Sequence, residues 1–117
     1  MTDYYSRFAE QAIQEALTDS PVVLIHGSRQ SGKTTLAKRI GEPLGYHYIS
    51  FDDANQLNAA HSDPVGFVRD LPNLCILDEV QRVPQIFTAI KAVVDSNRTA
   101  GRFILTGSAN ILLLPTL

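Results

Sequence analysis

Hydrophobic residues along the chain follow two different spacings, which together predict alternating helices and strands. Between residues 3 and 18, apolar side chains recur every three to four positions and form one continuous stripe, which predicts an amphipathic helix. Ser20 and Pro21 end that pattern. The apolar run from Val22 to Ile25 then predicts a strand, and residues 32–40 return to helical spacing.

The middle of the chain is less regular and predicts one strand followed by two short helices. Residues 46–51 favour a strand but mix polar with apolar side chains, which is typical of a strand near the edge of a sheet. We expect Gly41 to end the preceding helix and Gly45 to open this strand. Residues 54–57 and 64–68 favour two short helices with a break between them.

The last third of the chain contains the two most apolar strand candidates. Residues 74–77 are all apolar, which predicts a strand buried on both faces, and residues 102–108 predict another. Between them, apolar residues at positions 86, 87, 90, 93 and 94 predict a helix. We expect Pro84 in the first turn of this helix and Asn97 at its end.

A phosphate-binding pattern, G-x-x-x-x-G-K-S/T, lies between the first strand and the following helix. Gly27 and Gly32 would let consecutive backbone N–H groups approach a polyphosphate, and the helix that opens at Gly32 would direct its positive end at the anion. Lys33 would place an ammonium between the β- and γ-phosphates, and the Thr34 hydroxyl would complete a magnesium shell. The residues expected to bind the nucleotide here are Gly27, Ser28, Arg29, Gln30, Ser31, Gly32, Lys33, Thr34 and Thr35.

Acidic and hydroxyl residues follow the buried strands at the edge of the sheet where ligands bind in parallel folds. Asp78 would hold Mg²⁺ with Thr34, and Glu79 would orient and deprotonate an attacking water, so that Glu79 and Lys33 are the predicted catalytic residues. Ser108, at the end of the last strand, would sense the γ-phosphate or the water.

Two features near these residues have alternative interpretations. Asp52 and Asp53 most simply form the N-cap of the next helix, but they could instead be a second pair of acids near the magnesium. Tyr4, Tyr5 and Arg7 lie in the leading helix, where core packing is favoured for the aromatic rings and contact with an adenine is the alternative.

Composition narrows the functional classes. The 117 residues are 44% hydrophobic and 19% charged, with a net charge of −2 and no basic stripe, so nothing supports electrostatic binding of nucleic acid by this segment. The single cysteine, Cys75, lies in an apolar run and is expected to be a buried structural thiol. No signal peptide or membrane-spanning stretch is present, so we expect one cytoplasmic domain over residues 1–117.

The motifs in this order resemble the nucleotide-binding domain of the AAA-superfamily predicted ATPases of bacteria and archaea, which is usually followed by a C-terminal domain of unknown function. The segments that carry the resemblance are Gly27 to Leu36, Phe51 to Asp53, Leu77 to Gln81 with Val83 and Pro84, Lys91, Val94 and Asp95, and Leu105 to Ala109. The resemblance implies an α/β P-loop fold of three layers, α/β/α, with a parallel sheet in the order 1-4-3-2. The family's fifth strand, its lid, its second domain and its γ-phosphate arginines would follow residue 117.

The resemblance also implies binding of ATP with Mg²⁺ and, in the intact protein, hydrolysis of the γ-phosphate. Because the chain resembles only the N-terminal part of the family, we expect partners in the form of a second copy or a C-terminal domain. The rival hypothesis is a non-catalytic nucleotide-binding or interaction module left by truncation. A motor linked to nucleic acid is a third, which the charge distribution does not support.

Overall fold

The computed structural model describes residues 2–27 and 32–108, with side chains from Arg7 onward. Its centre is a parallel sheet of four strands in the order β1-β4-β3-β2, as predicted. The strands are β1 (Val22–His26), β2 (His47–Ser50), β3 (Cys75–Asp78) and β4 (Phe103–Gly107). The mixed strand β2 lies at one edge of the sheet, which confirms the prediction made from its polar residues.

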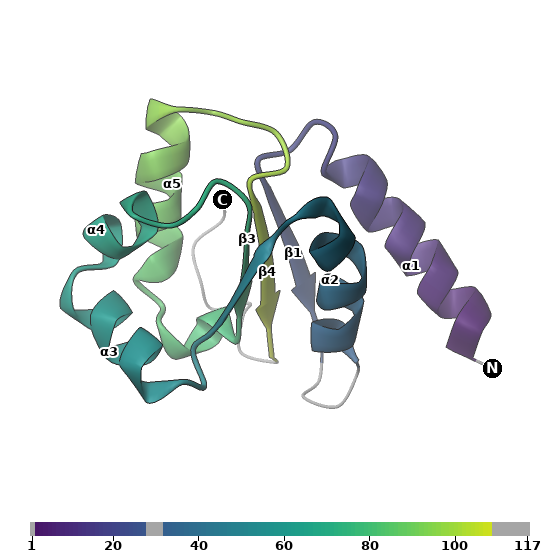
Figure 1. Ribbon diagram of the computed structural model, residues 1–117, viewed down its shortest axis with the longest axis horizontal. Coiled ribbons are helices and arrows are strands. Elements are labelled where there is room, and N and C mark those ends of the chain that lie inside the picture. Colours follow the sequence, from purple (N-terminus) through teal and green to yellow (C-terminus); the bar gives the residue numbers. More distant parts are fainter. Residues whose placement is uncertain (1, 28–31, 109–117) are drawn as a thin grey trace.

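Helices cover both faces of this sheet and complete the three predicted layers (Figure 1). On one side lie α1 (Thr2–Ala16) and α2 (Lys33–Gly41), and on the other lie α3 (Ala54–Ser62), α4 (Pro64–Arg69) and α5 (Ile86–Ser96). Two short 3₁₀ turns, η1 (Glu42–Leu44) and η2 (Val80–Arg82), follow α2 and β3.

The two central strands are buried on both faces, which explains why their sequences are apolar without alternation. In β3, Leu77 packs into the core under α3, α4 and α5, whereas Ile76 packs into the core under α1 and α2. In β4, Leu105 and Ile104 divide in the same way. The prediction of two strands buried on both faces is confirmed.

Of two expected helix boundaries, one is confirmed and one is wrong. The helix α2 ends at Gly41 as expected, but this glycine has a helical φ of −84°, and the left-handed turn comes at Gly45, which has φ 89°. A Cβ at position 41 would lie 2.8 Å from Ile76 Cδ1, so this glycine allows close packing of α2 against the sheet. The last helix begins at Ile86 rather than at Pro84, since residues 84–85 form a turn just before it. Its predicted end at Asn97 is confirmed.

Aspartates cap the two short helices between β2 and β3. The Asp53 carboxylate accepts a hydrogen bond from the Asn55 backbone N–H at 2.9 Å, which confirms the N-cap interpretation for this residue. Asp52 instead pairs with Arg82 at 3.2 Å on the surface. Asp63 ends α3 and caps α4 by accepting from the Gly66 N–H, so it marks the expected break.

Cys75 is fully buried, and its thiol points at the Pro72 carbonyl oxygen, 3.5 Å away. Burial raises the pKa of this thiol to about 11, with a smaller opposing effect from Arg102. The thiol therefore stays protonated and unreactive near neutral pH, as expected of a structural cysteine. Among the described residues, no helix has the length and apolar content needed to cross a bilayer.

Candidate nucleotide-binding and catalytic site

The predicted site residues gather where β1, β3 and β4 end, next to the start of α2. Gly32 is the N-cap residue of α2 and has φ 82°, a backbone conformation that favours glycine. Gly27 extends the pairing of β1 with β4, since its N–H donates to the Gly107 carbonyl oxygen at 3.2 Å. The part of the phosphate-binding pattern at Ser28, Arg29, Gln30 and Ser31 lies outside the described residues, so its role stays a prediction.

Thr34 and Asp78 meet at the centre of this site. The Thr34 hydroxyl donates to Asp78 Oδ1 at 3.0 Å, and the Asp78 side chain also accepts hydrogen bonds from the Tyr48 and Thr106 hydroxyls. A hydroxyl beside a carboxylate suits Mg²⁺, which takes oxygen ligands and commonly completes its shell with phosphate oxygens and water. Among the described residues, no group of three or more His, Cys, Asp or Glu side chains could hold a metal alone.

The Tyr48 hydroxyl is held as a donor in this arrangement. Burial and then the Asp78 carboxylate raise its pKa to about 12, so the phenol stays protonated at neutral pH. The Lys38 ammonium lies over the face of the same ring, 4.1 Å from its centre, in a cation–π contact. Tyr48 thus connects the edge strand β2 to the acid that the sequence predicts as a magnesium ligand.

Glu79 is held in a strained backbone conformation. With φ 63°, it is the one non-glycine residue with positive φ among those described, and its N–H donates to Thr106 Oγ1 at 3.0 Å. Its side chain is nearly buried and forms an ion pair with Lys33, in which Nζ lies 3.8 Å from Oε2. The predicted base and the predicted phosphate-binding cation are therefore partners in this structure.

The other carboxylate oxygen of Glu79 is held by Gln81 and Ser108. Gln81 Nε2 donates to Glu79 Oε1 at 2.7 Å, and Ser108 Oγ donates to the same oxygen at 3.2 Å. The Ser108 N–H donates in turn to Gln81 Oε1 at 3.0 Å. These three hydrogen bonds link Glu79, which follows β3, to Ser108, which follows β4.

An apolar hollow of about 330 Å³ opens beside Lys33, between α1, β1 and α2. Its lining residues are Ala9, Ala12, Ile13, Leu24, Ile25, His26, Lys33 and Leu36. Of the residues considered for adenine contact, Arg7 is exposed, and the side chains of Tyr4 and Tyr5 lie outside the described part of the chain.

The structure thus brings together Lys33, Thr34, Asp78, Glu79 and Ser108 from the predicted set. Thr35 lies exposed in the first turn of α2. Two residues of the cluster were not singled out from the sequence: Tyr48 and Gln81. Thr106, which contacts Asp78 and Glu79, is one of the small hydroxyl residues at the end of the last strand.

Comparison with known proteins decides the family. A family model described as an AAA domain matches residues 19–117. The chain belongs to this family. The match, together with the parallel sheet, identifies the chain as a nucleotide-binding P-loop domain of the ATPase type.

Two curated relatives are similar over most of this chain. They are the uncharacterized proteins Mb2031c of Mycobacterium bovis and Rv2008c of Mycobacterium tuberculosis, each 36% identical over 105 residues, or 89% of the chain. The matched region is 23% of the length of each relative. The chain therefore corresponds to only part of these longer proteins.

Proposed function

We propose that this AAA domain binds ATP with Mg²⁺ and, within its intact protein, hydrolyses the γ-phosphate. The observation that supports this most is the placement of Thr34 against Asp78 at 3.0 Å beside the ion pair of Lys33 with Glu79. A hydroxyl, two carboxylates and one cation are the parts that phosphoryl transfer to water needs around the terminal phosphates.

Each residue has a separate role in this proposal. Lys33 would bind the β- and γ-phosphates and balance the charge that develops on them. Thr34 and Asp78 would hold Mg²⁺, which supplies further neutralisation of the phosphate charge. Glu79 would accept the proton of the attacking water through Oε2, the oxygen that Lys33 contacts. Binding of ATP would thus exchange one Lys33 partner for another.

This chain can bind ATP well and still hydrolyse it slowly. Arg82, a candidate for acting on the γ-phosphate, is paired with Asp52 on the surface, and Arg29 lies outside the described residues. An arginine aimed at the transition state is worth about 10³ to 10⁵ in rate in related reactions. We therefore expect turnover by this chain alone to stay well below about 1 s⁻¹.

The proposed domain spans the whole chain, including α1. The family match begins at residue 19, but Ile13 and Leu17 pack into the core that α2 covers. A second copy or a C-terminal domain remains the proposed partner.

Calorimetric titration of the chain with Mg·ATP tests the proposal directly. We expect saturable binding to one site, and tighter binding with Mg²⁺ than with EDTA because Thr34 and Asp78 would gain a ligand. Absence of binding by the parent chain would contradict the function. Binding without any hydrolysis under single-turnover conditions would instead support the non-catalytic module.

A further inference from the structure

A second cavity, of about 300 Å³, lies between α4 and α5 at the amino end of β4. It is lined by Val65, Arg69, Ala92, Val93, Ser96, Asn97 and Arg102. Arg102 directly precedes β4, whereas Ser108 follows the opposite end of the same strand. This cavity is therefore separate from the nucleotide site.

Arg102 is an unusual lining residue because it is buried and one of its N–H donors has no partner among the described residues. Only 8% of the residue is exposed, and its Nε atom is buried without a hydrogen-bond partner among the described residues. The guanidinium carbon lies 5.0 Å from the centre of the Phe103 ring, which accounts for one face of the group but satisfies none of its N–H donors. A guanidinium keeps its charge at any physiological pH, so this burial is costly without an anion.

No acidic side chain of the described residues pairs with Arg102. Residues 28–31 and 109–117 contain no aspartate or glutamate. The side chain of Asp3 is not described, but α1, which carries it, lies on the opposite face of the sheet (Figure 1). An anion brought by another molecule would therefore find an available partner in Arg102.

We propose that this cavity binds a carboxylate carried on a short aliphatic stem, as in a glutamate side chain of another polypeptide or a free dicarboxylic acid. The planar fork of Arg102 matches the two oxygens of a carboxylate, and Arg69 supplies a second cation at the rim. The apolar walls formed by Val65 and Val93 suit the methylene groups of such a stem. Sulfate and inorganic phosphate, which have no apolar part, fit this lining less well.

Calorimetric titrations of the full chain with two probes test the site and separate its sources. Glutarate represents a free acid, and glutamate blocked by N-acetylation and α-amidation presents only its side-chain carboxylate. We expect binding of one or both, more tightly than sulfate at matched ionic strength. Equal binding of both probes indicates a polypeptide side chain, whereas binding of glutarate alone indicates a small acid. Failure of both probes overturns the proposal.

Variants link that binding to Arg102. Arg102→Met should weaken probe binding by about 10-fold or more, because a charge-assisted hydrogen bond is lost, whereas Arg102→Lys keeps the charge and should weaken binding less. Arg98→Met removes the same charge at an exposed position outside this cavity and should have no effect. Equal probe binding by Arg102→Met and the parent would contradict the assignment.

Stability without ligand gives an independent readout. If the role of Arg102 is to bind a carboxylate ligand, Arg102→Met removes a buried charge at similar volume. This substitution should then leave the melting temperature unchanged or raise it. If the arginine is only structural, the same substitution should lower the melting temperature, and the probes should not stabilise the parent. That second pattern would overturn the inference.

Discussion

Lys33 Nζ lies 3.8 Å from Glu79 Oε2, and the two side chains are only 2% and 8% exposed. This pair balances two charges that would be costly to bury separately. It also places the proposed base and the proposed phosphate-binding cation in contact. ATP would have to draw Lys33 toward its phosphates, and that movement would release the oxygen of Glu79 that is needed for proton transfer.

The pairing means that Lys33 matters for stability as well as for binding. Lys33→Met should abolish Mg·ATP binding and should lower the free energy of unfolding by about 3 kcal/mol, because it leaves Glu79 buried without its cation. Adding Glu79→Gln to that variant should restore most of the stability but none of the binding. Urea denaturation and calorimetry measure the two effects. Nucleotide affinity equal to that of the parent would contradict the role of Lys33.

Glu79→Gln alone should separate binding from chemistry. Mg·ATP affinity should be equal or higher, since Thr34 and Asp78 remain and Lys33 no longer has a competing carboxylate. Hydrolysis should fall by about 10²-fold or more, the usual cost of losing a positioned base. Single-turnover measurement with the chain in excess over ATP checks this. Hydrolysis at the parent rate would show that another group accepts the proton.

Gln81 should act as a positioning residue for that base, because it holds Glu79 Oε1 while Oε2 faces Lys33. Gln81→Met should lower kcat by about 10-fold and leave KM nearly unchanged, as expected when a group is slightly misplaced. Combining it with Glu79→Gln should add no further loss, since the two residues act as one unit. Gln85→Met, at an exposed position before α5, is the matched control. Additive losses would contradict the positioning role.

The hollow beside Lys33 is a candidate site for the base of ATP, and a substitution at its lining tests this. Ala12 lines this hollow yet is exposed, so Ala12→Trp should fill the space without disturbing the core. If the base binds there, ATP affinity should fall about 10-fold, a loss of about 1.4 kcal/mol, while affinity for inorganic tripolyphosphate stays the same. Gln14→Trp, exposed on α1 but outside the hollow, should change neither. An equal loss for both ligands would place the base elsewhere.

The sequence predicted the sheet and the main site because the signals for both are local. A glycine-rich loop, a lysine after it and two acids after an apolar strand are contiguous in the chain, so no knowledge of packing is needed to find Lys33, Thr34, Asp78 and Glu79. The strand order came from the family resemblance, and the structure confirms it.

The residues that sequence reasoning missed depend on contacts between distant segments. Tyr48 reaches Asp78 only because β2 and β3 pair with Tyr48 opposite Ile76, and no local pattern fixes that register. Gly41 does end α2, as expected for a glycine, but the room that its missing side chain makes for Ile76 could not be predicted locally. The burial of Arg102 likewise follows from the packing of α4 and α5 rather than from its neighbours in sequence.

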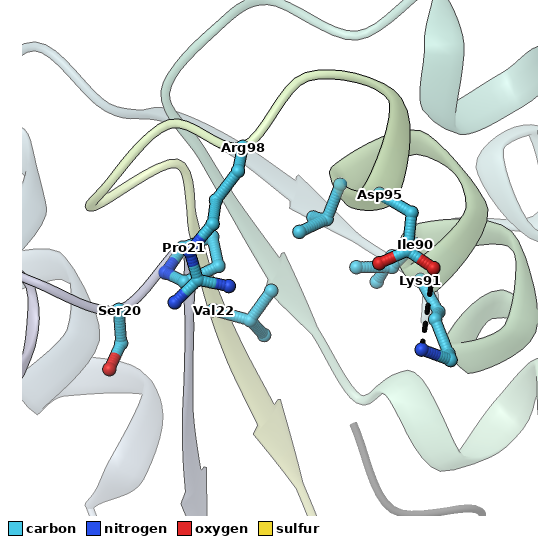
Figure 2. A pocket seen from close by; sticks show the side chains of 8 residues that line it. Ser20, Pro21, Val22, Ile90, Lys91, Asp95 and Arg98 are labelled. Atoms are coloured by element: carbon cyan, nitrogen blue, oxygen red, sulfur yellow. Dashed lines mark hydrogen bonds and ion pairs between the residues drawn. The ribbon is translucent and has the colours of Figure 1, made fainter.

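The outer edge of β1 has no strand beside it among residues 2–27 and 32–108. The Phe103 N–H donates to the Pro21 carbonyl, and the Gly27 N–H donates to the Gly107 carbonyl, so odd-numbered residues direct their backbone groups at β4. Even-numbered residues such as Leu24 therefore direct theirs outward. A hollow of about 350 Å³ also flanks this strand. Figure 2 shows Val22 on one side of it and Lys91 and Asp95 of α5 on the other.

An apolar open edge of this kind favours pairing with another chain, so we expect a dimer or larger species in solution. Docking of the chain's own residues 111–117 on this edge is the alternative, and those residues lie outside the described part of the chain. Leu24→Pro removes an outward N–H and should yield a folded monomer, since proline is tolerated where a strand donor faces solvent. Val23→Pro removes a donor to β4 instead and should unfold the domain. Light scattering gives the mass, and circular dichroism reports folding. A parent chain that is monomeric at high concentration, or a Leu24→Pro variant that still dimerises, would show that the β1 edge is not the contact.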